Sequence, residues 1–198
     1  MSTVVVKLGV GNTASVMFAL ERLNAPATLT DDPARIGGAE RIILPGVGAA
    51  AHAMDLIAKK GLRDVLRAFK RPLLGVCLGQ QLLFESSEEG DAEGLALLPG
   101  RVTRLPASKE APAPHMGWSK LKIEQDNALL EGVEDGAYAY FVHSYVCPID
   151  ANTIASAAYG QRFAAIVNRG NAYGCQFHPE RSSAVGARIL ENFLSLPC

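Results

Sequence analysis

Short aliphatic runs alternate with helix-like segments along the first half of the chain. Strand, glycine turn and helix repeated in this way predict βαβ units and a parallel sheet covered on both faces. Active sites in such sheets lie at the carboxyl ends of the strands, where Gly9, Pro45 and Cys77 all fall. The predicted buried strands are Thr3–Leu8, Arg41–Leu44 and Pro72–Val76, and the predicted helices are Thr13–Leu23, an alanine-rich segment ending near Lys59, and Leu62–Phe69.

The second half has a different pattern, in which β-like runs are joined by short polar turns. This pattern favours antiparallel or mixed strands packed onto the first half, followed by a C-terminal helix at about Ser183–Leu194. Pro106–Pro114 contains three prolines and is expected to be an exposed loop. The expected strands are Arg101–Leu105, Leu121–Glu124, Tyr138–Cys147, Thr153–Ala157, Phe163–Asn168 and Ala172–Phe177.

Composition and length indicate an ordinary globular protein. With 198 residues, 48% hydrophobic and 20% charged, the chain is expected to form one domain spanning residues 1–198. A formal net charge of -1 gives no reason to expect a nucleic-acid partner. No stretch approaches the roughly 20 apolar residues needed to span a bilayer, and the first residues lack a signal-peptide pattern. We therefore expect a cytoplasmic location and no membrane partner.

The cysteines indicate a reactive thiol and not a metal site or a disulfide framework. The four cysteines include no C-x-x-C pair, so neither a metal site nor a disulfide framework is expected, and no cofactor is indicated. Cys77 ends an apolar run and lies between Gly75 and Gly79, just before a helical pattern. G-x-C-x-G in this position is the cysteine form of the nucleophile elbow, a strained turn that points the sulfur at a helix N-terminus and favours thiolate. On this segment alone, a buried core cysteine between two packing glycines is the alternative.

A cysteine nucleophile needs a base and a group that orients the base. His178 is the best of the four histidines, because it ends a predicted strand and is followed by Pro179 and Glu180. Side chains two residues apart in an extended turn project to the same side, so Glu180 can hold the far nitrogen of the His178 ring. His52 is expected inside a helix, His115 in a loop and His143 within a strand. A histidine in an ordinary surface turn is the alternative for His178 taken by itself.

The segments Gly75–Gln81 and Gln176–Glu180 together resemble the class I (triad) glutamine amidotransferases, which hydrolyse glutamine to glutamate and ammonia through a γ-glutamyl thioester. Further segments narrow the resemblance to the glutaminase subunits of imidazole glycerol phosphate synthase. It covers essentially the whole chain and implies an α/β, three-layer, flavodoxin-like fold whose central, mostly parallel sheet has added antiparallel strands. The further segments are Gly9–Asn12, Leu44–Gly48, Pro114–Trp118, Tyr140–Tyr145 and Arg181–Ser183.

Carried onto this sequence, the resemblance implies that Cys77 is the nucleophile, His178 the acid–base and Glu180 its orienting group. Two backbone amides forming an oxyanion hole would stabilise the transition state by several kcal/mol. The implied oxyanion-hole positions are Leu78 and either Val47 or Gly48. The implied glutamine-binding positions are Gly46, Gln81, Glu89, Ser144 and Tyr145. Without the resemblance, Glu89 is simply one residue of a solvated acidic run.

The implied partner is a (β/α)8-barrel cyclase that forms a heterodimer with this chain and receives its ammonia. That cyclase converts ribulosyl-formimino aminoimidazole carboxamide ribonucleotide to imidazole glycerol phosphate and aminoimidazole carboxamide ribonucleotide, for histidine and purine synthesis. Asn12, Trp118 and Arg181 match interface positions, although an aromatic residue such as Trp118 is also common in an ordinary core. The chain departs from the family pattern at Ser119, where asparagine is usual, and also at Lys7 and Gln80.

The residues by themselves leave two other functions open. One is a cysteine hydrolase of related fold that acts on peptides or γ-glutamyl conjugates. The other is a binding module that keeps the fold without catalysis, against which the intact Cys77, His178 and Glu180 set argues.

Overall fold

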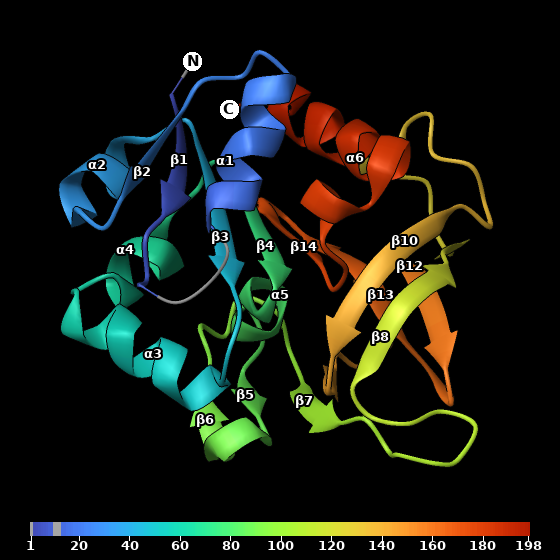
Figure 1. The fold of residues 1–198 in the computed structure, drawn as a ribbon. Coiled ribbons are helices and arrows are strands. Elements are labelled where there is room, and N and C mark those ends of the chain that lie inside the picture. The colour runs from blue at the N-terminus through green and yellow to red at the C-terminus, as the bar shows by residue number, and fades with distance from the viewer. Residues whose placement is uncertain (1, 10–12) are drawn as a thin grey trace.

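The computed structural model describes residues 2–9 and 13–198. Within these residues the largest sheet has eight strands, in the order β2-β1-β3-β4-β14-β13-β12-β9 (Figure 1). The strands from β2 to β14 run parallel, and β13, β12 and β9 continue the sheet with antiparallel pairing. The predicted α/β fold with a mostly parallel central sheet is therefore confirmed. The strands are β1 Thr3–Val6, β2 Ala27–Thr30, β3 Arg41–Gly46, β4 Leu73–Cys77, β9 Lys122–Ile123, β12 Thr153–Tyr159, β13 Gln161–Arg169 and β14 Ala172–Cys175.

Helices cover both faces of this sheet. Successive side chains of a strand point to opposite faces, so a strand buried on both sides needs an unbroken apolar run. Val4 and Ile42 pack in the core under α2, α3 and α4, whereas Val5 and Ile43 pack under α1 and α6. Figure 1 shows these two groups of helices on opposite sides of the sheet. The helices are α1 Thr13–Arg22, α2 Pro33–Gly38, α3 Ala50–Lys59, α4 Arg63–Ala68, α5 Leu78–Leu82 and α6 Ser183–Ser195.

Two smaller sheets complete the described part of the chain. The antiparallel pair of β8 and β10, which we call the hairpin although β9 and η2 lie between its strands in the chain, packs Ala139 and Phe141 into the same core as α1 and α6. A four-stranded sheet, in the order β11-β7-β5-β6, lies beyond the carboxyl end of β4 (Figure 1). Among the described residues, no helix combines the length and the apolar character that crossing a membrane requires. The additional elements are β5 Ser86–Ser87, β6 Ala92–Glu93, β7 Arg101–Arg104, β8 His115–Lys120, β10 Tyr138–His143, β11 Tyr145–Val146, and the 3-10 turns η1 Glu89–Asp91, η2 Ala128–Leu130 and η3 Pro179–Arg181.

Several local expectations were wrong. His115 does not lie in a loop, because it begins β8 and pairs with His143 of β10. The single strand expected at Tyr138–Cys147 is interrupted at Ser144, where the chain leaves the hairpin and joins the small sheet as β11. The expectation that the later strands pack onto the first half holds for β8 and β10 only, because β14 pairs directly with β4, and β13, β12 and β9 continue the same sheet. Strand β2 and helix α2 were not expected at all, since both are short and each has only one large apolar side chain.

Helix α6 approaches η3 so closely that Gly186 has no room for a side chain. A Cβ built on Gly186 would lie 1.9 Å from the Pro179 carbonyl oxygen. We expect Gly186→Ala to lower the free energy of unfolding by about 1–3 kcal/mol, because either α6 or η3 must move. Gly38→Ala is the matched control: nothing lies within 4 Å of its added Cβ, so urea unfolding should show equal or slightly higher stability. Equal stability of the two variants would contradict the packing argument.

Candidate active site

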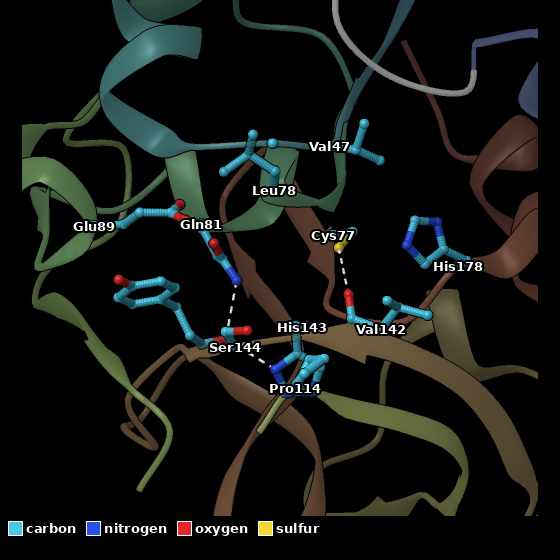
Figure 2. A pocket seen from close by; sticks show the side chains of 12 residues that line it. Val47, Cys77, Leu78, Gln81, Glu89, Pro114, Val142, His143, Ser144 and His178 are labelled. Atoms are coloured by element: carbon cyan, nitrogen blue, oxygen red, sulfur yellow. Dashed lines mark hydrogen bonds between the residues drawn. The ribbon is translucent and has the colours of Figure 1, made fainter. Parts of the chain in front are cut away.

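A cavity of about 250 Å³ opens at the carboxyl ends of β3 and β4 (Figure 2). It is bounded on the far side by the small sheet and by the end of β10. Pockets for small ligands usually measure roughly 300–1,000 Å³, so this one suits a ligand of amino-acid size. The lining residues are Val47, Gly48, Cys77, Leu78, Gln81, Glu89, Pro114, Val142, His143, Ser144, Tyr145 and His178.

Cys77 stands on a strained turn between β4 and α5. Its φ of 54° and ψ of -109° lie where residues with a side chain are rarely found. The turn is compact because a Cβ on Gly75 would lie 2.5 Å from the Gly79 carbonyl carbon, and one on Gly79 would lie 1.8 Å from the Leu44 carbonyl oxygen. Only glycine at both positions lets α5 start directly against β3. The sulfur is thereby carried to the cavity and to the first turn of a helix.

His178 and Glu180 form a hydrogen-bonded pair beside this cysteine. Nδ1 of His178 lies 2.8 Å from Oε1 of Glu180, and both side chains are largely buried. The turn that carries them is attached to Tyr140 of β10 on both sides. The His178 amide donates to the Tyr140 carbonyl at 3.0 Å, and the Tyr140 amide donates to Oγ of Ser182 at 2.9 Å. Because a carboxylate accepts the bond at Nδ1, the opposite ring nitrogen is the one free to exchange a proton in the cavity.

The electrostatics of His178 follow from these contacts. Burial acts to lower the pKa of the His178 ring, but hydrogen bonds and charge from Cys77 and Glu180 outweigh it and raise the pKa to about 10. Figure 2 shows the Cys77 sulfur and the His178 ring at the same end of the cavity. A protonated imidazole beside a thiolate is the arrangement that a thiol–imidazole nucleophile requires.

Gln176 also contacts the sulfur, although the sequence analysis assigned it no role. Its Nε2 points at Sγ of Cys77 at 3.8 Å, and its Oε1 accepts a hydrogen bond from Nε2 of Gln81 at 3.0 Å. Sγ of Cys77 also lies 3.6 Å from the Val142 carbonyl oxygen, to which it donates a hydrogen bond only in its protonated form. Gln176 lies two residues before His178 in the segment that follows β14, so alternation along an extended chain was a signal that could have placed both side chains on the same side.

Glu89 lines the opposite end of the cavity (Figure 2). One of its oxygens accepts a hydrogen bond from the amide of Ala50, the first residue of α3, at 2.8 Å. Burial raises the pKa of the Glu89 carboxyl. The expectation of a merely solvated acidic run was therefore incomplete, because this carboxylate both binds the N-terminus of a helix and faces the pocket.

Ser144 and Tyr145 form the wall between β10 and β11. The Ser144 carbonyl accepts from the Leu105 amide at 2.8 Å. The Tyr145 carbonyl accepts from Gln81 Nε2 at 3.0 Å and from His143 Nδ1 at 2.9 Å. The side-chain amide of Gln81 therefore donates to two partners inside the protein, the Tyr145 carbonyl of this wall and Oε1 of Gln176. Pro114, Val142 and His143 also line the cavity and were not among the expected site residues.

Of the remaining expected residues, those that the structure describes lie outside the cavity. Gly46 pairs with Cys77 in the sheet and does not line the pocket. Trp118 is 51% exposed, so the alternative of an ordinary core tryptophan is wrong. Its ring lies 5.7 Å from that of Tyr140, over which the guanidinium of Arg181 sits at 5.3 Å. Asn12 lies outside the residues that the structure describes.

Comparison with known proteins assigns the family. Residues 8–196 match the family described as Glutamine amidotransferase class-I. The imidazole glycerol phosphate synthase subunit HisH of Xanthomonas axonopodis pv. citri (strain 306) is 51% identical over 188 residues, covering 95% of this chain and 94% of that protein. HisH of Xylella fastidiosa (strain 9a5c) is 50% identical with the same coverage. The chain belongs to the class-I glutamine amidotransferases, in their HisH group.

Solved structures support the same fold at much lower identity. A putative GMP synthase component from Thermoplasma acidophilum has a TM-score of 0.75 at 19% identity, covering 98% of this chain and 92% of that one. PurLQS from Thermotoga maritima has a TM-score of 0.71 at 22% identity, covering 98% and 97%. The fold of a class-I glutamine amidotransferase is thus retained across sequences that share about a fifth of their residues.

The pKa of His178 gives a direct test of the site in this glutamine amidotransferase. We expect Cys77→Ala and Glu180→Gln each to lower the pKa from about 10, because each removes a partner that favours the charged ring while burial still opposes it. Titration followed by NMR of the ring nitrogens measures the change. Cys198→Ala, which removes the exposed free cysteine, is the control and should leave the His178 titration as it is. Titration curves that coincide in all the proteins would show that the pair does not act on His178.

Proposed function

We propose that this chain is a glutaminase that hydrolyses L-glutamine to glutamate and ammonia through a thioester on Cys77. The observation that carries the proposal is the combination of a strained, cavity-facing Cys77 with the hydrogen-bonded His178–Glu180 pair in one pocket. A cavity of about 250 Å³ with a carboxylate at the far end matches an amino acid that carries an α-ammonium and a side-chain carboxamide.

In the proposed reaction, the Cys77 sulfur attacks the side-chain carboxamide carbon of glutamine. His178 holds the thiol proton and passes it to the departing nitrogen, so that ammonia leaves and a γ-glutamyl thioester remains. Water then attacks the thioester carbon, giving one proton to His178. Glutamate is released as the sulfur leaves, which restores the starting pair. Glu180 keeps Nδ1 of His178 occupied and stabilises the imidazolium throughout.

Negative charge develops on the carboxamide oxygen as the sulfur attacks, and hydrogen-bond donors must stabilise it. The Leu78 amide belongs to the first turn of α5, where backbone amides have no partner within the helix. Val47 or Gly48, on the exposed turn that follows β3, supplies the second amide in this proposal. Two such donors stabilise the transition state by several kcal/mol.

The other end of the cavity would hold the amino-acid part of glutamine. We assign the Glu89 carboxylate to the α-ammonium, and the Ser144–Tyr145 backbone with Gln81 to the adjoining wall. Gly46 would contribute through the backbone of the turn that it begins. Sequence resemblance supports all of these assignments, and position in the pocket supports each of them except Gly46.

An apolar surface beside the cavity is our candidate for the partner site. We call it the hairpin face: the outer side of β8 and β10, formed by Met116, Trp118, Tyr138 and Tyr140, with Arg181 stacked on it. Met116 and Trp118 are 63% and 51% exposed, which is unusual for large apolar side chains that lie together. Met116 pairs with Val142, a residue of the pocket wall, so the hairpin face reaches the cavity.

We propose that this face binds a (β/α)8-barrel cyclase as a heterodimer. Ammonia released at Cys77 would pass to that protein, which makes imidazole glycerol phosphate and aminoimidazole carboxamide ribonucleotide from its ribonucleotide substrate. The relatives' name, which makes HisH one subunit of imidazole glycerol phosphate synthase, supports a partner of this kind. We place the enzyme in the cytoplasm, because the reaction needs Cys77 as a free thiol and all four cysteines are free.

Replacement of the nucleophile separates the two halves of the proposed reaction. In the complex with the cyclase, Cys77→Ala should lower glutamine-dependent product formation at least about a thousandfold. Synthesis from added ammonium salts should stay unchanged, because the cyclase needs only the ammonia. Product formation is followed by absorbance and glutamate release by a coupled assay. Glutamine-dependent synthesis by the variant, or hydrolysis of γ-glutamyl peptides in preference to glutamine by the unmodified chain, would reject the proposal.

The hairpin face can be tested by binding. Trp118→Ala should weaken cyclase binding by about tenfold or more, since a large aromatic side chain in an interface centre typically contributes over 1 kcal/mol. Glutamate release should also rise when the cyclase and its nucleotide are added to the unmodified chain. Ile149→Ala removes an exposed apolar side chain outside the hairpin face and should bind normally. Calorimetry that finds equal affinities for the two variants would place the partner elsewhere.

A further inference from the structure

Two buried histidines, of which His143 lines the cavity and His115 lies behind it, take no part in the proposed reaction. His115 is 1% exposed and His143 is 6% exposed. Nδ1 of His115 lies 2.9 Å from Nε2 of His143, and the two remaining ring nitrogens also have partners. Nε2 of His115 lies 2.9 Å from Oγ of Ser119, and Nδ1 of His143 lies 2.9 Å from the Tyr145 carbonyl oxygen. A continuous line of hydrogen bonds therefore runs from β8 to the pocket wall.

The direction of every bond in this line follows from its last member. A carbonyl oxygen only accepts, so Nδ1 of His143 must carry the hydrogen that is donated to Tyr145. With one hydrogen on a neutral ring, Nε2 of His143 is the acceptor and Nδ1 of His115 is the donor. Nε2 of His115 is then an acceptor as well, and it is satisfied by the hydroxyl of Ser119. Both rings thus carry their hydrogen on Nδ1, and no donor faces another donor.

The surroundings favour neutral rings. Burial lowers the pKa of His115 to about 4. Burial also lowers the pKa of His143 to about 3, although the bond to Tyr145 acts in the opposite direction, and nearby His115 and His178 add to the lowering. The ring of His115 stacks between Phe141, at 5.0 Å, and Tyr159, at 4.0 Å. Near neutral pH neither ring is expected to take up a proton, so each ring nitrogen keeps its role as donor or acceptor.

The Tyr145 carbonyl is where this line meets the pocket. It lies just after Ser144, at the break between β10 of the hairpin and β11 of the small sheet. Within the described residues, the carbonyl accepts bonds from His143 and from Gln81 of α5. Three separate parts of the fold are therefore tied together at one oxygen atom. The pairing of β11 with β7 and the bond from the Leu105 amide to the Ser144 carbonyl hold the neighbouring backbone. The Tyr145 carbonyl points away from that pairing, and the bonds from His143 and Gln81 satisfy it and fix its direction in the wall that faces the ligand.

We propose that His143 and His115 are positioning residues, which act as an ordered, neutral pair to set the Ser144–Tyr145 wall for glutamine. This rests on the proposed glutaminase function and deepens it. The pair bonds neither to the sulfur of Cys77 nor to the reacting carbon of glutamine. It acts on glutamine binding through the Tyr145 carbonyl, and Ser119 completes it at the far end.

The direction of the hydrogen bonds between the two rings is tested first, on the unmodified chain. Long-range 15N NMR correlations distinguish a protonated from an unprotonated ring nitrogen. We expect both His115 and His143 to carry hydrogen on Nδ1 and none on Nε2 across neutral pH, although free neutral histidine prefers the opposite form. A hydrogen on Nε2 of either ring would contradict the proposed direction of the hydrogen bonds in the pair. This measurement needs no substitution and no activity.

The positioning role is tested with His115→Phe in the complex with the cyclase. Phenylalanine keeps the stack between Phe141 and Tyr159 but leaves Nε2 of His143 without its donor. We expect the KM for glutamine to rise about tenfold, as for the loss of a partner to a buried polar group, with a smaller change in kcat. Alkylation of Cys77 by iodoacetamide, located by mass spectrometry because Cys198 is exposed, should keep its rate. His52→Phe, on the exposed side of α3, is the matched control and should leave all three quantities unchanged.

Ser119 provides a conservative pair of variants. Ser119→Asn retains a donor for Nε2 of His115 and should keep the KM of the unmodified enzyme, whereas Ser119→Ala should raise it. An unchanged KM in His115→Phe, or slower alkylation of Cys77 without a change in KM, would overturn the positioning role. If the unmodified complex releases no glutamate, the proposed function itself fails, and the NMR result still decides whether the pair is ordered. Should His115→Phe not fold, the Ser119 pair and the NMR result decide the question.

Discussion

The contact between α5 and β3 is the constraint on which the rest of the site depends. Helix α5 begins so close to the end of β3 that a single Cβ on Gly79 would overlap the Leu44 carbonyl oxygen, 1.8 Å away. This approach forces Cys77 into a strained backbone conformation, which persists because the sheet beneath it is packed on both faces. The strain places the sulfur, the first amides of α5 and the turn after β3 around one small volume.

Strand β10 organises the other side of that volume. The backbone of Tyr140 holds the turn that carries His178 and Glu180, while its side chain lies in the hairpin face between Trp118 and Arg181. The same strand ends at His143, which bonds to the Tyr145 carbonyl in the pocket wall. A partner seated on the hairpin face would therefore touch the element that holds both the proposed acid–base group and the ligand wall. A packed and hydrogen-bonded element of this kind can carry coupling between a docking surface and a catalytic site.

Much of the fold could be predicted from hydrophobic patterns, because β1, β3 and β4 are unbroken apolar runs buried on both faces. The failures have physical causes. Ala27–Thr30 is short and half polar, and it becomes a strand only because β1 offers an edge to pair with. His115–Lys120 reads as a loop but is held as β8 by β10. The break at Ser144 was invisible because apolar residues continue on both sides of it.

By itself, the sequence determined the chemical parts that depend on neighbours in the chain: the elbow around Cys77 and the pairing of His178 with Glu180 two residues on. Those contacts follow from backbone geometry over a few residues. Only the tertiary structure decided that Gln176 reaches the sulfur, that His115 and His143 form a pair, and that Gln81 bonds to Gln176. The last two contacts join residues 28 and 95 positions apart, and the direction of a hydrogen bond between such distant residues is set by packing that no local pattern encodes.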